Sequence, residues 1–505
     1  MVGFLLKVLL AAAAVLLTCV IWWIRDRRRK HTFFRDLGVP GPKPTLLWGN
    51  RKQLSEDTIK VMGQWIKTYG KVFGMYRSES PVLVISDAEM IKQCFVKEFD
   101  AFHDKPGPPV LVEPFKDSLP FLKGDEWKKV RTLLNPAFST AKMRLMMQTI
   151  NKCADVFVDI LTESSQKGEV LEMYKVAQGL SLDVITKCAL AWQVDCQKNP
   201  DDPLLKELKN IFRNTSNVGA RISFWFPALK HVIEILHKKW QFMVTQENII
   251  ANLRNVISLR RRGQAPSVPD LLQLMLNCQS DASNAKDHTD QKNLLLEDRM
   301  LIANCFIFIL GGLETTSLAL AYTLFLLAKH PEEQDRLFQE LTDMFPGNQE
   351  LSSDDLRKLK RLDIVFKESL RLYPPTVAFV SRTCRRDITV MGQFIPSGTS
   401  VTVPVWHLHH DADYWPDPFK FDPERFSEGQ ERHPPEAYAP FGLGPRACIG
   451  SRLAMLELKA TLVKVVRRFK ILLCDETQDP PKIRIPLSLT LPENGIRLKL
   501  DRRDP

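Results

Sequence analysis

The sequence predicts a mainly α-helical protein with small β-sheets, preceded by an N-terminal transmembrane helix. Segments with helical periodicity fill most of the 505 residues, and only a few short segments have strand character. The chain is 44% hydrophobic, so it can bury a large core. Length alone would favour two or more domains.

The N-terminal apolar segment has the composition and flanks of a membrane anchor. Val8 to Ile24 contains one polar residue, Thr18, and the apolar stretch lengthens if the Lys7 ammonium reaches the lipid headgroups. A basic cluster at 25–30 follows directly, where a cleaved signal peptide would carry small residues. We therefore expect residues 1–24 to span the membrane once, with the rest of the chain in the cytosol.

A proline-rich segment separates this anchor from the remainder. Val39 to Pro44 reads Val-Pro-Gly-Pro-Lys-Pro and cannot form a helix, because each proline restricts its own φ and the residue before it. Residues 25–50 are expected to form a basic stop-transfer segment and a stiff hinge.

Strand signals are short and local. Val72–Tyr76 and Val82–Ile85 have strand character, and Ile388–Val403 is expected to form a hairpin that turns at Met391-Gly392. Two polar, loop-like segments lie at 263–270 and 279–292.

Leu301 to Ala328 is almost entirely apolar, yet Gly311-Gly-Leu-Glu-Thr-Thr316 lies at its centre. Each glycine in a helix costs about 1 kcal/mol relative to alanine. A second membrane span is disfavoured because Glu314 would be costly in lipid, and an ordinary core helix would also exclude a carboxylate. A helix that passes close to a ligand explains both features, since glycine leaves space, Thr315 offers a hydroxyl and Glu314 a proton.

One of the ten cysteines stands apart. No C-x-x-C pair occurs, which argues against a disulfide framework or a cysteine-rich zinc site, so most thiols are expected to be buried and reduced. Cys448 instead lies in a glycine-containing loop, between Phe441, Arg446 and Gly450. An amphipathic helix follows at Ser451–Phe469, and its N-terminal amides would favour a thiolate.

That loop matches F-x-x-G-x-R-x-C-x-G at every specified position and resembles the haem-thiolate loop of the cytochrome P-450 superfamily. The resemblance covers nearly the whole chain after the anchor, and the motifs are most similar to the clan of animal drug- and xenobiotic-metabolising members. It implies one large catalytic domain over 51–505 that binds haem b. Cys448 would be the axial iron ligand, with Phe441 near the sulfur and Arg446 at a haem propionate.

Further motifs agree with this resemblance. Gly311–Thr316 resembles the family's (A/G)-G-x-(D/E)-T-(T/S) motif, which implies that Thr315 contacts dioxygen and Glu314 relays protons. Glu368-Ser-Leu-Arg371 and the arginine of Pro423-Glu-Arg425-Phe resemble the family's buried network behind the cysteine loop.

Three side chains are expected to join Arg446 around the propionates. Trp127 and Arg131 lie at i and i+4, on one helix face, and Arg382 matches the family's arginine at the second propionate. Lys105 and His103 match more loosely. The histidines at 407, 409 and 410 are expected to be structural rather than ligands of a non-haem metal.

The resemblance implies a microsomal monooxygenase of the endoplasmic reticulum that inserts one atom of O2 into a lipophilic small molecule. The chain carries no flavin or nicotinamide motif, so electrons must come from a separate NADPH-dependent flavoprotein reductase, with cytochrome b5 as a second donor. The formal charge of +11 suits anionic lipid or an acidic partner, and nucleic acid is not expected. A candidate basic docking face comprises Lys128, Lys129, Lys459, Lys464, Arg467 and Arg468.

Two other functions remain open at this stage. One is a haem-thiolate isomerase or dehydratase that needs no reductase, and the other is a haem-binding protein without catalysis. Glu314 and Thr315 argue against the first. A cluster of large apolar residues at Phe224–Leu229 is a candidate membrane contact, with core packing as the alternative.

Overall fold

The structure is a computed structural model that describes residues 2–107, 114–190, 192–214, 241–263, 270–273, 275–277, 298–347, 349–430, 432–486 and 488–503. The predicted segment Phe224–Leu229 and most of the two predicted loops at 263–270 and 279–292 lie outside the described residues.

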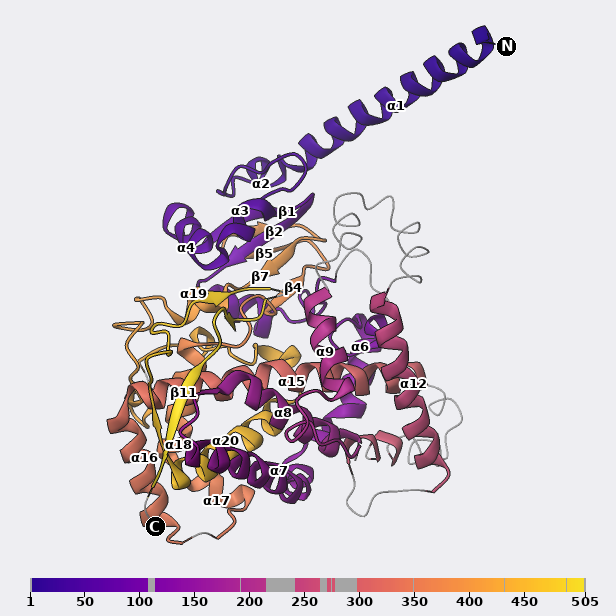
Figure 1. The fold of residues 1–505 in the computed structure, drawn as a ribbon. Coiled ribbons are helices and arrows are strands. Elements are labelled where there is room, and N and C mark those ends of the chain that lie inside the picture. Colours follow the sequence, from indigo (N-terminus) through magenta and orange to yellow (C-terminus); the bar gives the residue numbers. More distant parts are fainter. Residues whose placement is uncertain are drawn as a thin grey trace, which may run out of the picture.

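A large helical body is built around one central helix, α15 (Asp298–Lys329) (Figure 1). Its most extensive contact is with α8 (Met173–Leu190), and it also packs against α18 (Lys360–Leu372) and α20 (Ser451–Arg468). Within its most apolar window 72% of residues are buried inside the protein. The expectation of a buried core helix rather than a second membrane span is therefore confirmed.

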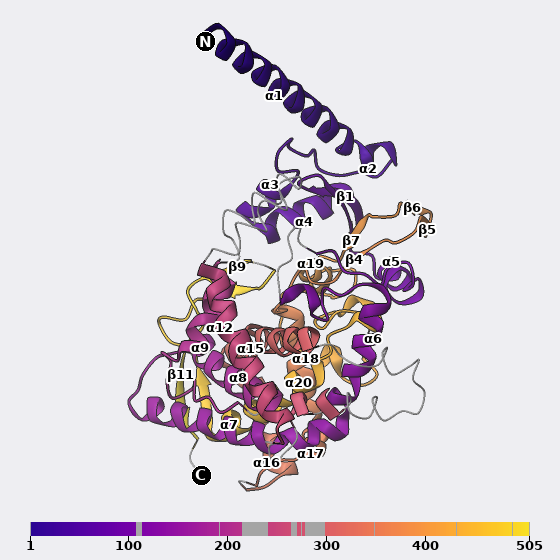
Figure 2. The ribbon, with the colours of Figure 1, turned by 90° about the vertical axis from the view of Figure 1, so that its right-hand side faces the viewer.

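The other helices surround this centre or cover the small sheets (Figure 2). They are α2 (Phe33–Asp36), α3 (Arg51–Glu56), α4 (Thr58–Tyr69), α5 (Ala88–Lys92), α6 (Gly124–Leu134), α7 (Thr140–Gln166), α9 (Pro203–Asn214), α12 (Gln241–Arg261), α16 (Pro331–Met344), α17 (Ser353–Lys358) and α19 (Val405–His409).

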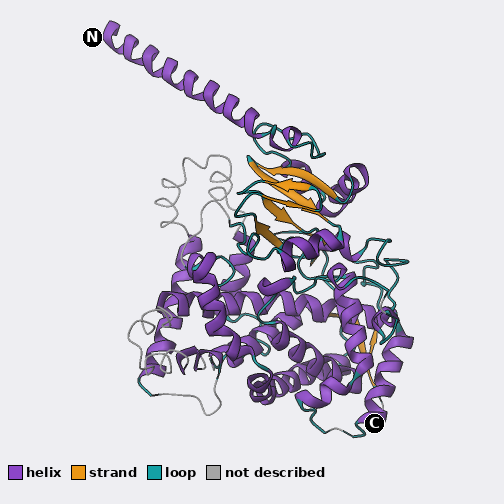
Figure 3. Cartoon of the chain, turned by 180° about the vertical axis from the view of Figure 1, so that it is seen from behind, coloured by secondary structure: helices purple, strands orange, loops and turns teal. Residues whose placement is uncertain are grey.

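The principal sheet has the strand order β1-β2-β7-β4 and lies at the end of the body nearest the N-terminal helix (Figure 3). Its strands are β1 (Val72–Arg77), β2 (Ser80–Ile85), β4 (Ser381–Thr383) and β7 (Ser400–Thr402). A three-stranded sheet joins β3 (Leu171–Glu172), β11 (Arg497–Arg502) and β8 (Phe469–Leu472), and β9 (Ile483–Arg484) pairs with β10 (Leu491–Pro492). Both strands predicted near residues 72–85 are confirmed.

The predicted hairpin over 388–403 is only half correct. β5 (Ile388–Val390) and β6 (Gln393–Ile395) form it, and Met391 (φ 48°) and Gly392 (φ 81°) make the turn. Both central residues adopt the positive φ that suits a two-residue hairpin. β7 leaves this hairpin and pairs in parallel with the distant β2 and antiparallel with β4, which precedes the hairpin.

The N-terminal helix α1 (Val2–Lys30) projects away from the body (Figure 1). It is long and apolar enough to cross a membrane, and none of its most apolar window is buried. The proline-rich segment after it lies against β1: the Gly74 amide donates to the Pro40 carbonyl at 2.8 Å. A Cβ on Gly41 would lie 1.9 Å from the Gly74 oxygen, so this contact requires glycine.

Candidate functional site

The Cys448 loop is closed by its own backbone and rests on a neighbouring segment. The Cys448 amide donates to the Phe441 carbonyl at 2.8 Å. Gly444 has φ +67°, and a Cβ there would lie 2.2 Å from the Phe95 carbonyl oxygen. Position 444 thus requires glycine because the Phe95 backbone leaves no room for a Cβ. Phe441 packs on the edge of the main hydrophobic core.

The Cys448 side chain is accessible, yet it is desolvated by the protein around it. Desolvation there raises the pKa of its thiol, while the amides of Gly450 and Ser451 and the cations Lys105 and Arg131 act in the opposite direction. The start of α20 thus supplies the backbone donors that the sequence predicted. The cations and amides stabilise the thiolate form of Cys448, so the sulfur can act as a thiolate ligand once a metal compensates the desolvation.

The structure brings the predicted propionate-binding residues together around this loop. The Arg131 guanidinium donates to the Ala447 carbonyl at 3.0 Å, and that of Arg382 donates to the Leu443 carbonyl at 3.1 Å. The guanidinium carbon of Arg446 lies 4.1 Å from the centroid of the Trp127 ring. Four residues from three separate parts of the chain therefore converge within a few residues of Cys448.

The buried cations near Cys448 outnumber the carboxylates described near them. Arg382 is 1% exposed and Arg446 is 6% exposed. Burial lowers the pKa of Arg382 to about 10, and burial together with Arg382 lowers the pKa of Arg446 to about 9. Burial and these arginines lower the pKa of Lys105 to about 7. Among the described residues, Asp104 is the carboxylate near Arg446, at 3.9 Å.

An anionic group with a soft metal fits this region. The buried Nε of Arg382 has no hydrogen-bond acceptor among the described residues. Uncompensated buried cations are costly, and a dianionic ligand would relieve them. Haem b carries two propionates, and its iron accepts a thiolate. The donor set around Cys448 therefore fits a haem.

Arg446 also has a structural task that its motif does not reveal. Its guanidinium donates to the carbonyls of His103 (2.7 Å), Leu119 (3.2 Å) and Leu122 (2.7 Å). It thus fixes the segment that carries Lys105. Lys105, matched only loosely from the sequence, lies close enough to Cys448 and the arginines to influence their charge.

The two glycines of α15 have different surroundings. A Cβ on Gly311 would meet nothing within 4 Å, whereas one on Gly312 would lie 2.8 Å from Cγ1 of Ile185 on α8. Gly311 therefore leaves open space, and Gly312 allows two helices to pack closely. The half-buried Thr315 is one turn from Gly311, and its hydroxyl donates to the Gly311 carbonyl at 2.6 Å.

Glu314 lies against α8 rather than on the open face with Gly311. It is 3% exposed, accepts a short hydrogen bond from the Tyr174 hydroxyl, and accepts from the Gln178 amide at 3.0 and 3.1 Å. Sequence reasoning missed Tyr174 and Gln178. Their i and i+4 spacing on one helix face was the available signal, but it does not indicate which carboxylate they meet.

The predicted buried network behind the cysteine loop is present. Glu368 and Arg371 are both fully buried and form a bidentate pair at 2.7 and 2.8 Å. Nε of Arg425 approaches Glu368 at 3.4 Å. Arg371 also donates to the carbonyls of His409 and Pro418, each at 2.7 Å. The three predicted members therefore meet, and they tie α18 to the chain before the cysteine loop.

The three clustered histidines each contact backbone. His407 is 2.8 Å from the Ile59 carbonyl, and His410 is 2.7 Å from the Trp406 carbonyl. Nε2 of His409 accepts from the Ala439 amide at 2.8 Å, and burial holds its pKa well below the usual range. A neutral His409 can therefore link the buried network to the cysteine loop. These contacts agree with the expected structural role.

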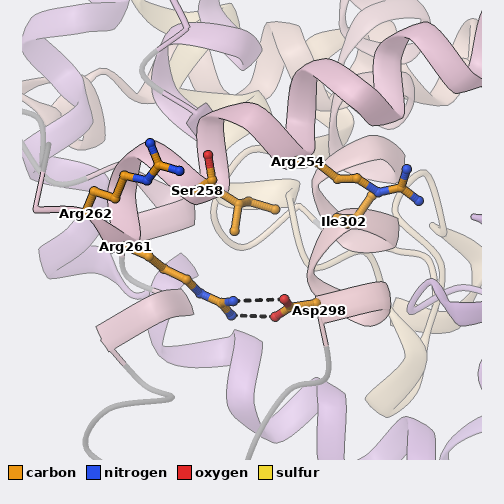
Figure 4. A pocket seen from close by; sticks show the side chains of 7 residues that line it. Arg254, Ser258, Arg261, Arg262, Asp298 and Ile302 are labelled. Carbon is orange, nitrogen blue, oxygen red and sulfur yellow. Dashed lines mark hydrogen bonds and ion pairs between the residues drawn. The ribbon is translucent and has the colours of Figure 1, made fainter.

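A separate hollow of about 340 Å³ lies between α12 and the start of α15 (Figure 4). It is bordered by Arg254, Arg262 and an ion pair in which Arg261 donates to Asp298 at 2.8 Å. Of the α15 residues that line the hollow, Ile302 is the one nearer to Gly311. It precedes Gly311 by nine residues, which is roughly 14 Å along the helix. This hollow is not part of the Cys448 region.

A thiol that faces an enclosed, cationic region of a mainly helical body defines a haem-thiolate protein. Comparison with known proteins agrees: the family described as Cytochrome P450 matches residues 39–500. Cytochrome P450 3A29 of Sus scrofa is 35% identical over 479 residues, 94% of this chain and 93% of its own length. Cytochrome P450 3A5 of Homo sapiens is 35% identical over 480 residues, again 94% and 93%. Cytochrome P450 3A41 of Mus musculus is 35% identical over 506 residues, 98% and 96%.

The chain belongs to the cytochrome P450 family. Its cofactor is haem b, and it is a monooxygenase that uses O2, lipophilic substrates and electrons from a redox partner. The fold class predicted from the sequence is confirmed.

Proposed function

We propose that Cys448 holds the haem iron and that Arg131, Arg382, Arg446 and Trp127 bind the haem edge. The observation that carries this assignment is the exposed Cys448 thiol in a region surrounded by buried cations. Haem, when bound through a thiolate, supplies the chemistry that activates dioxygen. Phe441 closes the loop that carries the sulfur, because its carbonyl accepts from the Cys448 amide.

The residues proposed to supply protons lie on α15. Gly311 leaves space beside the half-buried Thr315 hydroxyl, which can turn from the Gly311 carbonyl to a ligand in that space. Glu314 is the nearest acid in sequence and acts as the proton store, held ready by Tyr174 and Gln178. These contacts support the proposed roles of Thr315 as proton donor and of Glu314 as proton source.

Electrons come from a separate NADPH-dependent flavoprotein reductase, with cytochrome b5 as a second donor. Half of the candidate basic face is engaged within the protein: Lys459 pairs with Asp363 at 2.7 Å, Lys464 pairs with Asp155, and Arg467 donates to the Phe345 carbonyl at 3.0 Å. Lys128 and Lys129 have no ion-pair partner among the described residues and flank Trp127 on α6. The acidic partner therefore docks near α6.

The location follows from α1. Residues 1–24 span the endoplasmic reticulum membrane once, 25–50 form the stop-transfer and proline-rich segment, and 51–505 form the catalytic domain in the cytosol. An exposed apolar helix followed by a basic cluster supports this topology.

The test uses full-length protein loaded with haem and combined with the reductase. A lipophilic compound that shifts the Soret band should stimulate consumption of NADPH and O2 and yield an oxygenated product. Cys448→Ala should lose the thiolate-type spectrum of the reduced carbon monoxide complex, whereas Cys474→Ala should keep it. Turnover without NADPH would indicate an isomerase or dehydratase, and ligand binding without turnover a haem carrier. An unchanged spectrum in Cys448→Ala would refute the ligand assignment.

A further inference from the structure

The end of the anchor helix α1 contains a completely buried arginine. Arg27 is 0% exposed, although none of the most apolar window of the same helix is buried. Its neighbours Arg25, Arg28 and Arg29, which belong to the same basic cluster, are exposed. A stop-transfer signal requires positive charge but not burial, so this signal alone does not account for Arg27.

Arg27 is buried because the loop before α3 and the turn between β1 and β2 surround its guanidinium. Its Nε donates to the Leu46 carbonyl at 3.0 Å, and its Nη2 donates to the Leu47 carbonyl at 2.9 Å. Nη2 also contacts the Ser78 hydroxyl, and Nη1 pairs with Glu79 at 3.2 Å. The side chain thus joins the loop before α3, which ends the 25–50 segment, to the turn between β1 and β2 in the catalytic domain.

Further contacts reinforce the same joint. Lys30 pairs with Glu79 at 3.2 Å, and the His31 ring lies 2.9 Å from the Ser78 carbonyl. Just after α1, the backbone amide of the buried Phe34 donates to the Tyr76 hydroxyl at 3.0 Å. Anchor and domain are therefore connected by a set of contacts centred on the β1–β2 turn.

We propose that Arg27 is a latch that makes the membrane anchor and the catalytic domain one rigid body. The inference rests on the single-pass anchor proposed above. A membrane helix has a restricted range of tilt, set by its neighbours and its interfacial residues. A rigid joint transmits this tilt, so the bilayer fixes the orientation of the domain and of its haem plane. Without Arg27, the contacts of Lys30 and His31 with the β1–β2 turn remain, but the joint loses its buried centre and becomes looser.

Removal of Arg27 should weaken the contacts between α1 and the β1–β2 turn. The carbonyls of Leu46 and Leu47 and the carboxylate of Glu79 would lose a charged donor with several hydrogen bonds. The exposed Arg28 makes no comparable contact with the domain among the described residues, so it provides a matched arginine control within the same cluster.

The test is linear dichroism of the Soret band, measured on full-length, haem-loaded protein in oriented phosphatidylcholine bilayers. The wild type and Arg28→Ala should show the same clear dichroism, because the haem keeps one angle to the membrane. Arg27→Ala should bring the dichroic ratio close to the isotropic value. Glu79→Ala, which removes the acceptor of both Arg27 and Lys30, should shift it in the same direction. Dichroism in Arg27→Ala equal to that of the wild type would overturn the latch.

Two controls separate the possible failures. The reduced carbon monoxide spectrum shows whether each variant folds and keeps its haem, and Glu79→Ala replaces Arg27→Ala if the latter does not. Limited trypsin digestion gives a readout independent of haem: cleavage between Arg28 and Arg35 should be faster in Arg27→Ala than in Arg28→Ala. Release of the wild type from membranes by carbonate would overturn both the anchor and the latch, whereas membrane-bound protein with unchanged dichroism would overturn the latch alone.

Discussion

The hydroxyl of Tyr174 donates to the carboxylate of Glu314, and this contact joins α8 to the acid of the α15 motif. Gln178, one turn further along α8, donates to both oxygens of the same carboxylate. A glutamate with two donors is held in one rotamer and in one charge state more firmly than an exposed glutamate. The proton source proposed for this enzyme is thus controlled by two residues outside its motif.

Tyr174→Phe should increase the fraction of electrons lost to hydrogen peroxide. The substitution removes the hydroxyl that donates to Glu314, while the ring still fills its site. Product formed per NADPH consumed is the measurement. Gln178→Leu is the matched control, because it removes a hydrogen bond to the same carboxylate but no transferable hydroxyl proton. Equal coupling in Tyr174→Phe and the wild type would show that Tyr174 has no part in proton supply.

The adjacent glycines of α15 should respond in opposite directions to alanine. Gly312→Ala places a Cβ 2.8 Å from Ile185 Cγ1, and overpacking of this kind costs about 1–3 kcal/mol. Gly311→Ala meets no atom within 4 Å and gains about 1 kcal/mol of helix propensity. Thermal unfolding of the two variants tests this. The assignment of Gly312 to helix packing fails if both alanines stabilise the protein.

Glu368→Gln should reduce the yield of haem-loaded protein. It leaves Arg371 fully buried without its carboxylate, and the loss of one partner of a buried ion pair costs about 3–5 kcal/mol. The reduced carbon monoxide spectrum per mole of protein gives the haem content. Glu428→Gln is the control, since the Glu428–Lys360 pair is exposed on both sides and should not matter measurably. Normal haem content in Glu368→Gln would contradict a supporting role for the network.

Glu457 on α20 should make stability depend on pH. Its carboxyl is 4% exposed, and burial raises its pKa to about 8 from the ordinary value of 4.5, with an opposing hydrogen bond from Ser181 at 2.8 Å. The folded protein keeps this proton to a higher pH than the unfolded chain does. The Glu457 contribution to the free energy of unfolding is therefore greatest below pH 4.5 and falls as the pH rises from 4.5 to about 8.

Urea unfolding over that pH interval measures the effect. Glu457→Gln should remove the decrease, because the amide does not titrate. Ser181→Ala should extend the decrease to higher pH, since the lost hydrogen bond had lowered the pKa of Glu457. The same pH dependence in the wild type and Glu457→Gln would show that Glu457 titrates in the folded protein as it does in the unfolded chain.

The sequence by itself determined the features that lie within short segments. The loop around Cys448, the Gly311–Thr316 motif and the Glu368–Arg371 pair each lie within a few residues, so their resemblance to family motifs could be recognised from the sequence. The apolar N-terminal helix and the turn at Met391-Gly392 were equally local, because hydropathy and backbone preference act between near neighbours.

Only the tertiary structure decided which partners these local features meet. It placed Glu314 against Tyr174, separated the open Gly311 from the packed Gly312, moved β7 out of the predicted hairpin, and buried Arg27 beneath a turn some fifty residues away in sequence. The physical reason is that contacts between distant segments depend on how whole helices and sheets pack. The same arginine can be solvated or enclosed, and its own sequence neighbours do not distinguish the two.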